Sequence, residues 1–302
     1  MHNTSYYSMC SAFIRHWVDE TIIRWIRATL EGRMATAALR DVSRSVAVSR
    51  GCPQGGVLSP LLLCLVVDKL LVRPNQGSVY AQGYDEDICL VAGGKLLNMI
   101  SGLIQWALHT VAVWCSGFSL SVNPDNTGLV AFTRKRKLMR FLEPRLFSKT
   151  LQHSRSVKYL GVILDSRLTC KQHVDAKVKK AQNLMWACIR ACGVTWGLGP
   201  KVVQWLYVAI ISLSINFKSL VWFPGCQTAS AKRKLSRVQT LACLGITSAL
   251  RTTPTNAVEA LICLPPLDFV VQSEARSVGN RLWILGCWSY LHPNRGHNSI
   301  LI

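Results

Sequence analysis

The stretch Gly83-Tyr84-Asp85-Glu86-Asp87-Ile88 joins two short apolar runs, residues 79–84 and 88–92. Apolar runs on either side of a polar turn predict an antiparallel β-hairpin. Its tip would hold Asp85, Glu86 and Asp87 close together. Hard divalent cations such as Mg²⁺ take oxygen ligands while they keep waters and substrate phosphates. The tip is therefore either a solvated acidic turn or part of a metal site for phosphoryl transfer.

A glycine-rich loop and a helix precede this hairpin. Residues 50–60 read Arg-Gly-Cys-Pro-Gln-Gly-Gly-Val-Leu-Ser-Pro, and residues 61–71 are almost entirely apolar. Ser59 is expected to cap the helix, with Pro60 at the first helical position, where its missing N–H costs nothing. A loop at 51–57 would then lie directly ahead of the helix.

The remaining pattern predicts an α+β chain. Hydrophobic spacing indicates helices at 19–33 and 96–115, whereas alternation indicates paired strands within 35–50. Further strands are expected at 129–133 and 157–164, and from residue 174 onward the pattern is nearly all helical. Elements of both types occur in separate stretches, which favours a sheet with helices on it followed by a helical region.

Several of these segments resemble, in order, the motifs of reverse transcriptases. Residues 50–60 resemble the P-Q-G…S-P signature, and 83–88 occupy the place of the Y-x-D-D hairpin. Residues 120–127 resemble the next motif. Tyr159-Leu160-Gly161-Val162, with Asp165, Leu168 and His173, resembles the primer grip and thumb entry of non-LTR retrotransposon enzymes. The tail at 251–254, 264–267 and 281–282 resembles the helical segment that precedes RNase H in Jockey-like insect elements.

The resemblance implies a partial right-hand polymerase palm, with an antiparallel sheet and helices, at residues 1–165. A mostly helical thumb would occupy 166–225, and 226–302 would be a helical segment preceding a missing RNase H domain. The implied activity is RNA-directed DNA synthesis from dNTPs on an RNA or DNA template–primer, with magnesium as cofactor. Two groups of residues carry over by position: Pro53, Gln54, Gly55 and Tyr84 for nucleotide and template binding, and Glu86 and Asp87 as a weak magnesium site, with Asp85 as a further candidate.

The sequence departs from the family at the catalytic points. Glu86 stands where the first acid of the hairpin pair is Asp, and Asn126 stands where the family usually offers a lysine. Residues 2–5, His-Asn-Thr-Ser, resemble the segment just after the family's other metal-binding aspartate, so the chain is expected to be truncated. We therefore expect an impaired enzyme that retains nucleic-acid binding. Two alternatives are an active polymerase, if the start is misannotated or a partner supplies the aspartate, and a poorly folded relic.

Basic residues are concentrated in the second part of the chain. Residues 134–302 contain 25 Lys and Arg against 6 Asp and Glu, whereas residues 1–133 contain 10 against 9. Such a surplus favours a polyanionic partner, the alternative being a solvated basic surface. The predicted nucleic-acid contacts are Arg134, Lys135, Arg136, Lys137, Lys177, Lys179 and Lys180, with a second run at 232–237. The run at 134–137 also suits a nuclear-import patch.

Composition bears on the compartment. The first residues do not form a basic segment followed by an apolar run, so a secreted protein is not expected, and the twelve cysteines indicate free thiols in the nucleus or cytoplasm. Residues 96–124 lack charged side chains and are long enough to span a bilayer. Their polar residues recur at spacings of three and four, which is typical of an amphipathic core helix, so no membrane partner is expected.

Overall fold

The computed structural model describes residues 4–40, 42–52, 56–84, 87–118, 120–133, 135, 141–193, 197–286 and 298–301, the last range by its backbone alone. Two compact units are present, residues 1–155 with 296–302, and residues 156–295. The division into palm, thumb and a segment ahead of RNase H stays a prediction, because compactness alone does not identify those parts.

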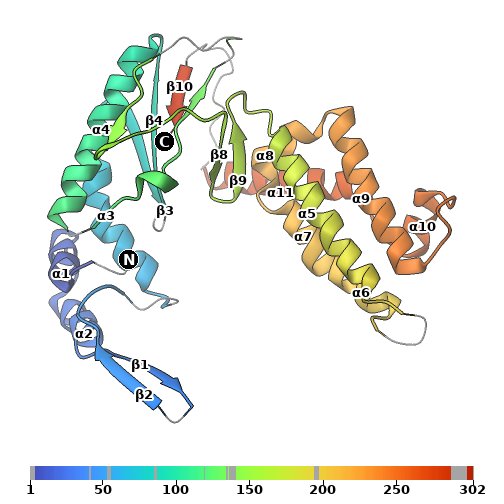
Figure 1. Ribbon diagram of the computed structural model, residues 1–302, viewed down its shortest axis with the longest axis horizontal. Helices are drawn as coiled ribbons and strands as arrows, with labels where there is room; N and C mark the ends of the chain where they lie inside the picture. The colour runs from blue at the N-terminus through green and yellow to red at the C-terminus, as the bar shows by residue number, and fades with distance from the viewer. Residues whose placement is uncertain are drawn as a thin grey trace. The chain divides into compact units, whose positions relative to one another are not determined.

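The first unit contains a small antiparallel sheet with helices packed on it. The sheet has the strand order β3 (Val79–Tyr84), β4 (Asp87–Gly94), β10 (Asn298–Leu301) and β5 (Val130–Phe132). Helices α3 (Ser59–Asn75) and α4 (Leu97–Gly117) pack against β3 and β4 (Figure 1). Their shared core includes Leu70, Ile104 and Leu108, all buried. The hairpin predicted at 79–84 and 88–92 is thereby confirmed.

A second cluster joins the amino-terminal helices to the start of α3. Helices α1 (Tyr6–Arg15) and α2 (Glu20–Leu30) contribute buried residues that pack with Val66 of α3. Asp19 caps α2 by accepting from the Thr21 amide at 2.8 Å. Strands β1 (Met34–Leu39) and β2 (Val42–Ala47) pair in antiparallel fashion, as alternation predicted, and both are exposed along their length. Two short strands, β6 (Arg145–Leu146) and β7 (Lys149–Thr150), form a further pair.

The second unit is a helical bundle that begins with a hairpin, β8 (Ser156–Tyr159) and β9 (Val162–Asp165). The long helices are α5 (Lys171–Arg190), α9 (Ala229–Thr247) and α11 (Leu267–Ile284). Shorter ones are α6 (Pro200–Leu206), α7 (Leu213–Asn216), α8 (Ser219–Cys226) and α10 (Thr255–Leu261), with a π-helical segment, Tyr207–Ser212, between α6 and α7. Large buried side chains, including Met185, Tyr207 and Trp222, fill the core between them. The predicted α+β class, with a small antiparallel sheet and its helices followed by a helical region, is confirmed.

Three local predictions were wrong. Residues 157–164 form a hairpin instead of one strand, because Leu160 and Gly161 turn the chain with positive φ angles of 45° and 82°. Helix α3 begins at Ser59, so its capping position is Leu58, which provides no side-chain cap. The chain end was expected to be helical, but residues 298–301 form β10 between β4 and β5.

The apolar segment predicted as a core helix is α4. Among the described residues, α4 is the one unbroken helix that is long and apolar enough to cross a membrane. The bent pair Pro200–Asn216 and Ser219–Cys226 would be a second candidate if the two helices are counted as one span. Buried side chains on α4, among them Ile100 and Val111, belong to the core against the sheet. Core helices of this kind pass the same test, so the feature is weak evidence for a membrane.

Candidate functional site

The β3–β4 hairpin places one acid and one aromatic residue side by side. Tyr84 and Asp87 are opposite each other at the last pair of the ladder, and both are exposed. Of the sequence-predicted hairpin residues, Asp85 and Glu86 lie outside the described residues. The structure thus locates Tyr84 and Asp87 at the tip of the hairpin and does not test the roles of the three acids.

Helix α3 fixes the hairpin through two hydrogen bonds at its last residue. The Asn75 side-chain amide donates to the Ala81 carbonyl, and the Ala81 N–H donates to the Asn75 carbonyl oxygen, each at 2.8 Å. Farther along β3, a Cβ on Gly83 would lie 3.3 Å from Leu71 and 3.5 Å from Val67. Strand β3 therefore runs back along α3, and the hairpin tip lies toward the amino-terminal end of that helix.

The loop ahead of α3 joins the same end of the helix. Pro53, Gln54 and Gly55 lie outside the described residues, but the backbone just before them is held by Arg33. Its guanidinium donates to the carbonyls of Gly51, at 2.5 Å, and Arg50, at 3.3 Å. The sequence analysis missed Arg33, because an isolated arginine ahead of an exposed strand gives no local signal.

Arg33 is itself held by Tyr6. The same guanidinium donates to the Tyr6 hydroxyl at 2.8 Å, and that hydroxyl donates to the Val48 carbonyl at 2.9 Å. The Gly51 N–H donates to the Thr4 carbonyl at 2.9 Å. Helix α1, the residue that follows β2 and the loop are therefore joined at one point, and α3 connects this point to the hairpin.

The segment that resembles the next motif forms a tight turn. Asn123 accepts from the Asp125 amide at 2.9 Å, which is an Asx turn, and Pro124–Asn126 form one turn of 3₁₀-helix. Asn126 is exposed there. The Lys149 ammonium, from β7, forms an ion pair with Asp125. Asn126 stands at the family's lysine position, but the turn is contacted by a lysine from elsewhere in the chain, Lys149 of β7.

The described residues do not form a metal site on their own. They contain no group of three or more His, Cys, Asp or Glu that could hold a metal ion. At the hairpin they provide one carboxylate, Asp87, and a magnesium ion needs more than one protein or substrate oxygen.

The motif predicted as thumb entry is a cluster of contacts between β9 and α5. Asp165 accepts from the Cys170 amide at 2.7 Å and from the Thr169 amide and hydroxyl at 3.1 and 2.9 Å. Partial burial raises the pKa of Asp165, but these hydrogen bonds lower it more, and its pKa ends below the usual value. The carboxylate thus satisfies amides at the start of α5.

His173 lies two residues into this helix and is 2% exposed. Its Nδ1 accepts from the Ile163 amide at 3.2 Å, and its ring lies beside Trp222. Desolvation, and then the charge of Lys177, lower the pKa of His173 to about 4. The imidazole is therefore neutral at physiological pH and joins the hairpin to the helix.

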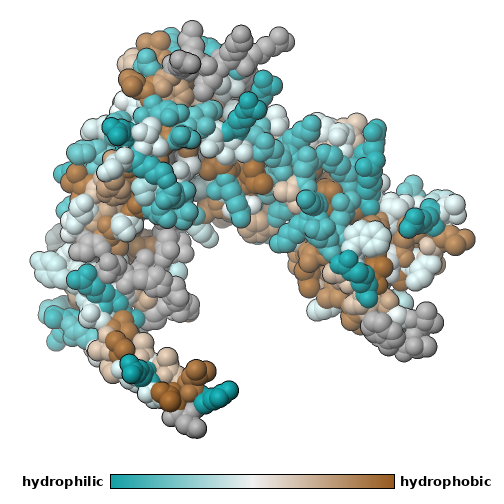
Figure 2. Space-filling view, in the orientation of Figure 1, coloured by the Kyte–Doolittle hydropathy of each residue, from teal (hydrophilic) through white to brown (hydrophobic). Residues whose placement is uncertain are grey.

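The predicted nucleic-acid contacts on α5 fall into two kinds. The Lys177 ammonium donates to the Ser214 carbonyl at 2.6 Å and lies over the Phe217 ring, so it is engaged inside the unit. Burial, with the charge of Lys180, lowers the pKa of Lys177. Lys179 and Lys180 are exposed. Figure 2 shows hydrophilic residues gathered over α5.

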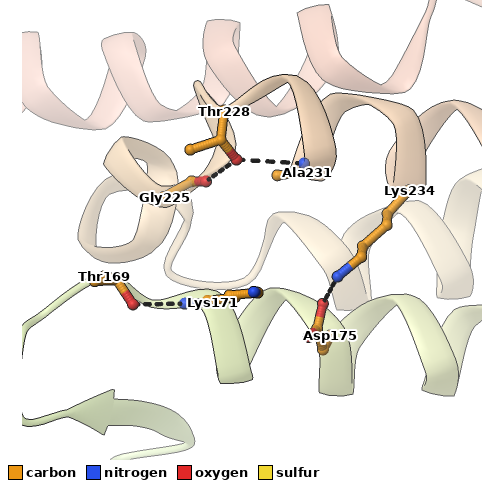
Figure 3. Close-up of polar contacts among 7 residues, drawn as sticks. All are labelled: Thr169, Lys171, Asp175, Gly225, Thr228, Ala231 and Lys234. Carbon is orange, nitrogen blue, oxygen red and sulfur yellow. Dashed lines mark hydrogen bonds and ion pairs between the residues drawn. The ribbon is translucent and has the colours of Figure 1, made fainter.

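Of the run at 134–137, Lys135 is exposed, whereas Arg134, Arg136 and Lys137 lie outside the described residues. In the run at 232–237, Lys234 forms an ion pair with Asp175 and so joins α9 to α5 (Figure 3). Thr228 caps α9 by accepting from the Ala231 amide at 3.3 Å. None of these contacts tests binding, and the predicted contacts stay predictions.

Comparison with known proteins identifies the class. A family model described as reverse transcriptase (RNA-dependent DNA polymerase) matches residues 9–164. This is more than half of the chain, and it includes the loop ahead of α3, the β3–β4 hairpin and all but the last residue of the β8–β9 hairpin. The chain belongs to the reverse transcriptase family.

Its relatives are proteins of insect non-LTR elements, as the motifs indicated. A 115 kDa protein in the type-1 retrotransposable element R1DM of Drosophila melanogaster is 26% identical over 80% of this chain and 23% of its own length. A retrovirus-related Pol polyprotein from the R1 element of Nasonia vitripennis is 21% identical over 72% of this chain and 66% of its own length. The RNA-directed DNA polymerase from mobile element jockey of Drosophila melanogaster is 22% identical over 89% and 29%. The resemblance to a Jockey-like reverse transcriptase region is thus confirmed, and the chain spans less than two thirds of each of these relatives.

Proposed function

We propose that this region binds RNA or DNA template–primer through its second unit and that its DNA synthesis is impaired. Family membership implies template binding and a divalent metal in general. The observation that carries the first part is the unbalanced charge of the second unit. Residues 156–295 contain 17 Lys and Arg against 5 Asp and Glu. A polyanion is the natural counterpart of such a surface.

The carboxylates of this unit do little to balance these cations. Among the residues that the structure describes there, a single ion pair joins a cation to an acid, Lys234 to Asp175. The Asp165 carboxylate accepts hydrogen bonds from the Thr169 and Cys170 amides and forms no ion pair with a described cation. Exposed lysines on α5, chiefly Lys179 and Lys180, are thus available for phosphates, whereas Lys177 supports the helix from inside.

The binding experiment is a salt titration with RNA and DNA template–primers. Each phosphate neutralised by the protein contributes about 0.7 to 0.9 to the slope of log affinity against log salt. The double variant K179A/K180A should lower the magnitude of that slope by about 1.5. The matched control, K69A/R73A, removes two exposed cations from α3 and should leave it unchanged. A slope near zero for the parent chain would refute the proposal.

The impairment follows from Glu86. Its side chain is one methylene longer than aspartate, and a preorganised site tolerates displacements of about 0.5 Å. Magnesium-dependent primer extension should therefore rise in E86D, and D87N should abolish the gain. Equal extension by the parent chain and E86D would show that Glu86 is not the defect.

A further inference from the structure

We propose that the cavity between α9, α10 and the start of α11 binds a single unpaired guanine nucleotide. This inference rests on the proposed function, because it names a nucleotide that the second unit would recognise. The cavity has a volume of about 820 Å³ and lies wholly within that unit. Ligand sites in proteins span roughly 300 to 1,000 Å³. The space therefore suits a nucleotide.

The proposed hydrogen-bond acceptor for the guanine is the carboxylate of Glu259. Glu259, on α10, lines the cavity and is only 9% exposed. No hydrogen bond or ion pair joins its carboxylate to another residue in the described ranges. The carboxylate oxygens keep contact with the solvent of the cavity, so they can accept hydrogen bonds from a ligand with N–H donors.

The other polar residues of the lining form hydrogen bonds that do not include the Glu259 carboxylate. Gln239, also in the lining and 2% exposed, accepts from the Tyr207 hydroxyl at 2.5 Å and donates to the Pro265 carbonyl at 3.1 Å. Asp268 also lines the cavity, and it accepts from the Phe269 amide at 3.0 Å. Glu259 is left as the acceptor for a bound molecule.

The remaining lining suits a base and a phosphate. Leu264, Pro265 and Phe269 present apolar surface, and Phe269 is 63% exposed and free to stack on a ring. Lys232 and Arg233 line the same cavity and form no ion pair with another described residue. The lining therefore contains two cations, Lys232 and Arg233, and two carboxylates, Glu259 and Asp268. These charges suit a ligand that has an anionic group and also N–H donors.

Guanine is the base that matches a carboxylate. Its Watson–Crick edge offers two adjacent donors, N1–H and the 2-amino group, to the two oxygens. Adenine, cytosine and uracil each offer donors from a single nitrogen on that edge. Unpaired bases are recognised in this way, by hydrogen bonds to their edges and by stacking on aromatic side chains.

The test compares GMP, IMP and AMP by calorimetry on the full chain at low salt. IMP lacks only the 2-amino group, so no variant has to fold for this comparison. GMP should bind about tenfold more tightly than IMP or AMP, as a bidentate contact provides. E259Q should lose this preference, because its amide offers one acceptor in place of two. E274Q, which removes an exposed acid of α11 outside the cavity, should keep it.

Absent binding, equal affinities for the three nucleotides, or a guanine preference that survives in E259Q would each overturn the inference. The salt titration with K179A/K180A separates this failure from failure of the proposed function. Salt-sensitive RNA binding without GMP selectivity would remove only the guanine site. GMP selectivity without RNA binding would leave the site and remove the proposed function.

Discussion

Acidification should destabilise the second unit through His173. The imidazole is 2% exposed, its Nδ1 accepts from the Ile163 amide, and its pKa is lowered from 6.5 to about 4. The folded state therefore binds the proton more weakly than the unfolded chain. Stability is at its full value above pH 6.5 and falls as the pH drops from about 6.5 toward 4.

The size of the effect follows from the two pKa values. At pH 5 the linkage relation gives a loss of about 2 kcal/mol relative to pH 7.5, and below pH 4 about 3 kcal/mol. A protonated Nδ1 can no longer accept from the Ile163 amide, so the bond between β9 and α5 is lost at the same time.

The assay is urea unfolding at pH 7.5, 6 and 5, followed by hydrogen exchange on peptides of α5, so that the second unit is measured separately from the first. The parent should lose about 2 kcal/mol between pH 7.5 and 5. H173Q should be less stable at pH 7.5 and should lose much less on acidification. H109Q, which replaces an exposed histidine of α4, should behave as the parent. The same pH dependence in H173Q and the parent would refute the reasoning.

Three further substitutions test the supports of the two units. G225A should destabilise the second unit by about 1 to 3 kcal/mol in chemical unfolding, since its Cβ would lie 2.4 Å from the Thr169 carbonyl oxygen; G279A, with its nearest atom at 3.6 Å, should be neutral. D165N should lower the free energy of unfolding by about 1 kcal/mol at pH 7, because the carboxylate that accepts from the Cys170 amide is lost. This difference from the parent should vanish as the pH falls through the lowered pKa of Asp165. An unchanged urea midpoint at pH 7 would contradict the capping role of Asp165. R33K should increase proteolysis of the loop ahead of α3, because lysine cannot reach the two carbonyls and the Tyr6 hydroxyl together. R24K, which replaces an exposed residue of α2, should not.

Local pattern predicted the elements whose partners are close in the sequence. The β3–β4 hairpin has strands that are joined by its own turn, and α4 is recognised by the spacing of its apolar residues. The prediction failed where a turn had no turn residue at its first position, as at Leu160. It also failed where the paired strands are far apart in the sequence, because β10 at 298–301 pairs with residues 91–94 and 130–132.

The candidate site divides in the same way. Motif order identified Tyr84 and Asp87 and the loop at 53–55, because the family's chemistry requires those residue types in that order. It did not find Arg33, whose contacts are with the remote Tyr6 and Gly51. The sequence analysis predicted Lys177 as a nucleic-acid contact, but the structure shows that the Lys177 ammonium donates to the Ser214 carbonyl inside the unit.

The sequence by itself determined the family, the order of the motifs, the α+β class and the excess of positive charge in the second part of the chain. These depend on residue identity and short-range spacing, which a linear chain records directly. Only the tertiary structure decided which charges are used internally, such as Lys177 and Lys234, and which carboxylate, Glu259, faces a cavity. The reason is that burial and hydrogen-bond partners are set by residues distant in the sequence, and these come together only when the core packs.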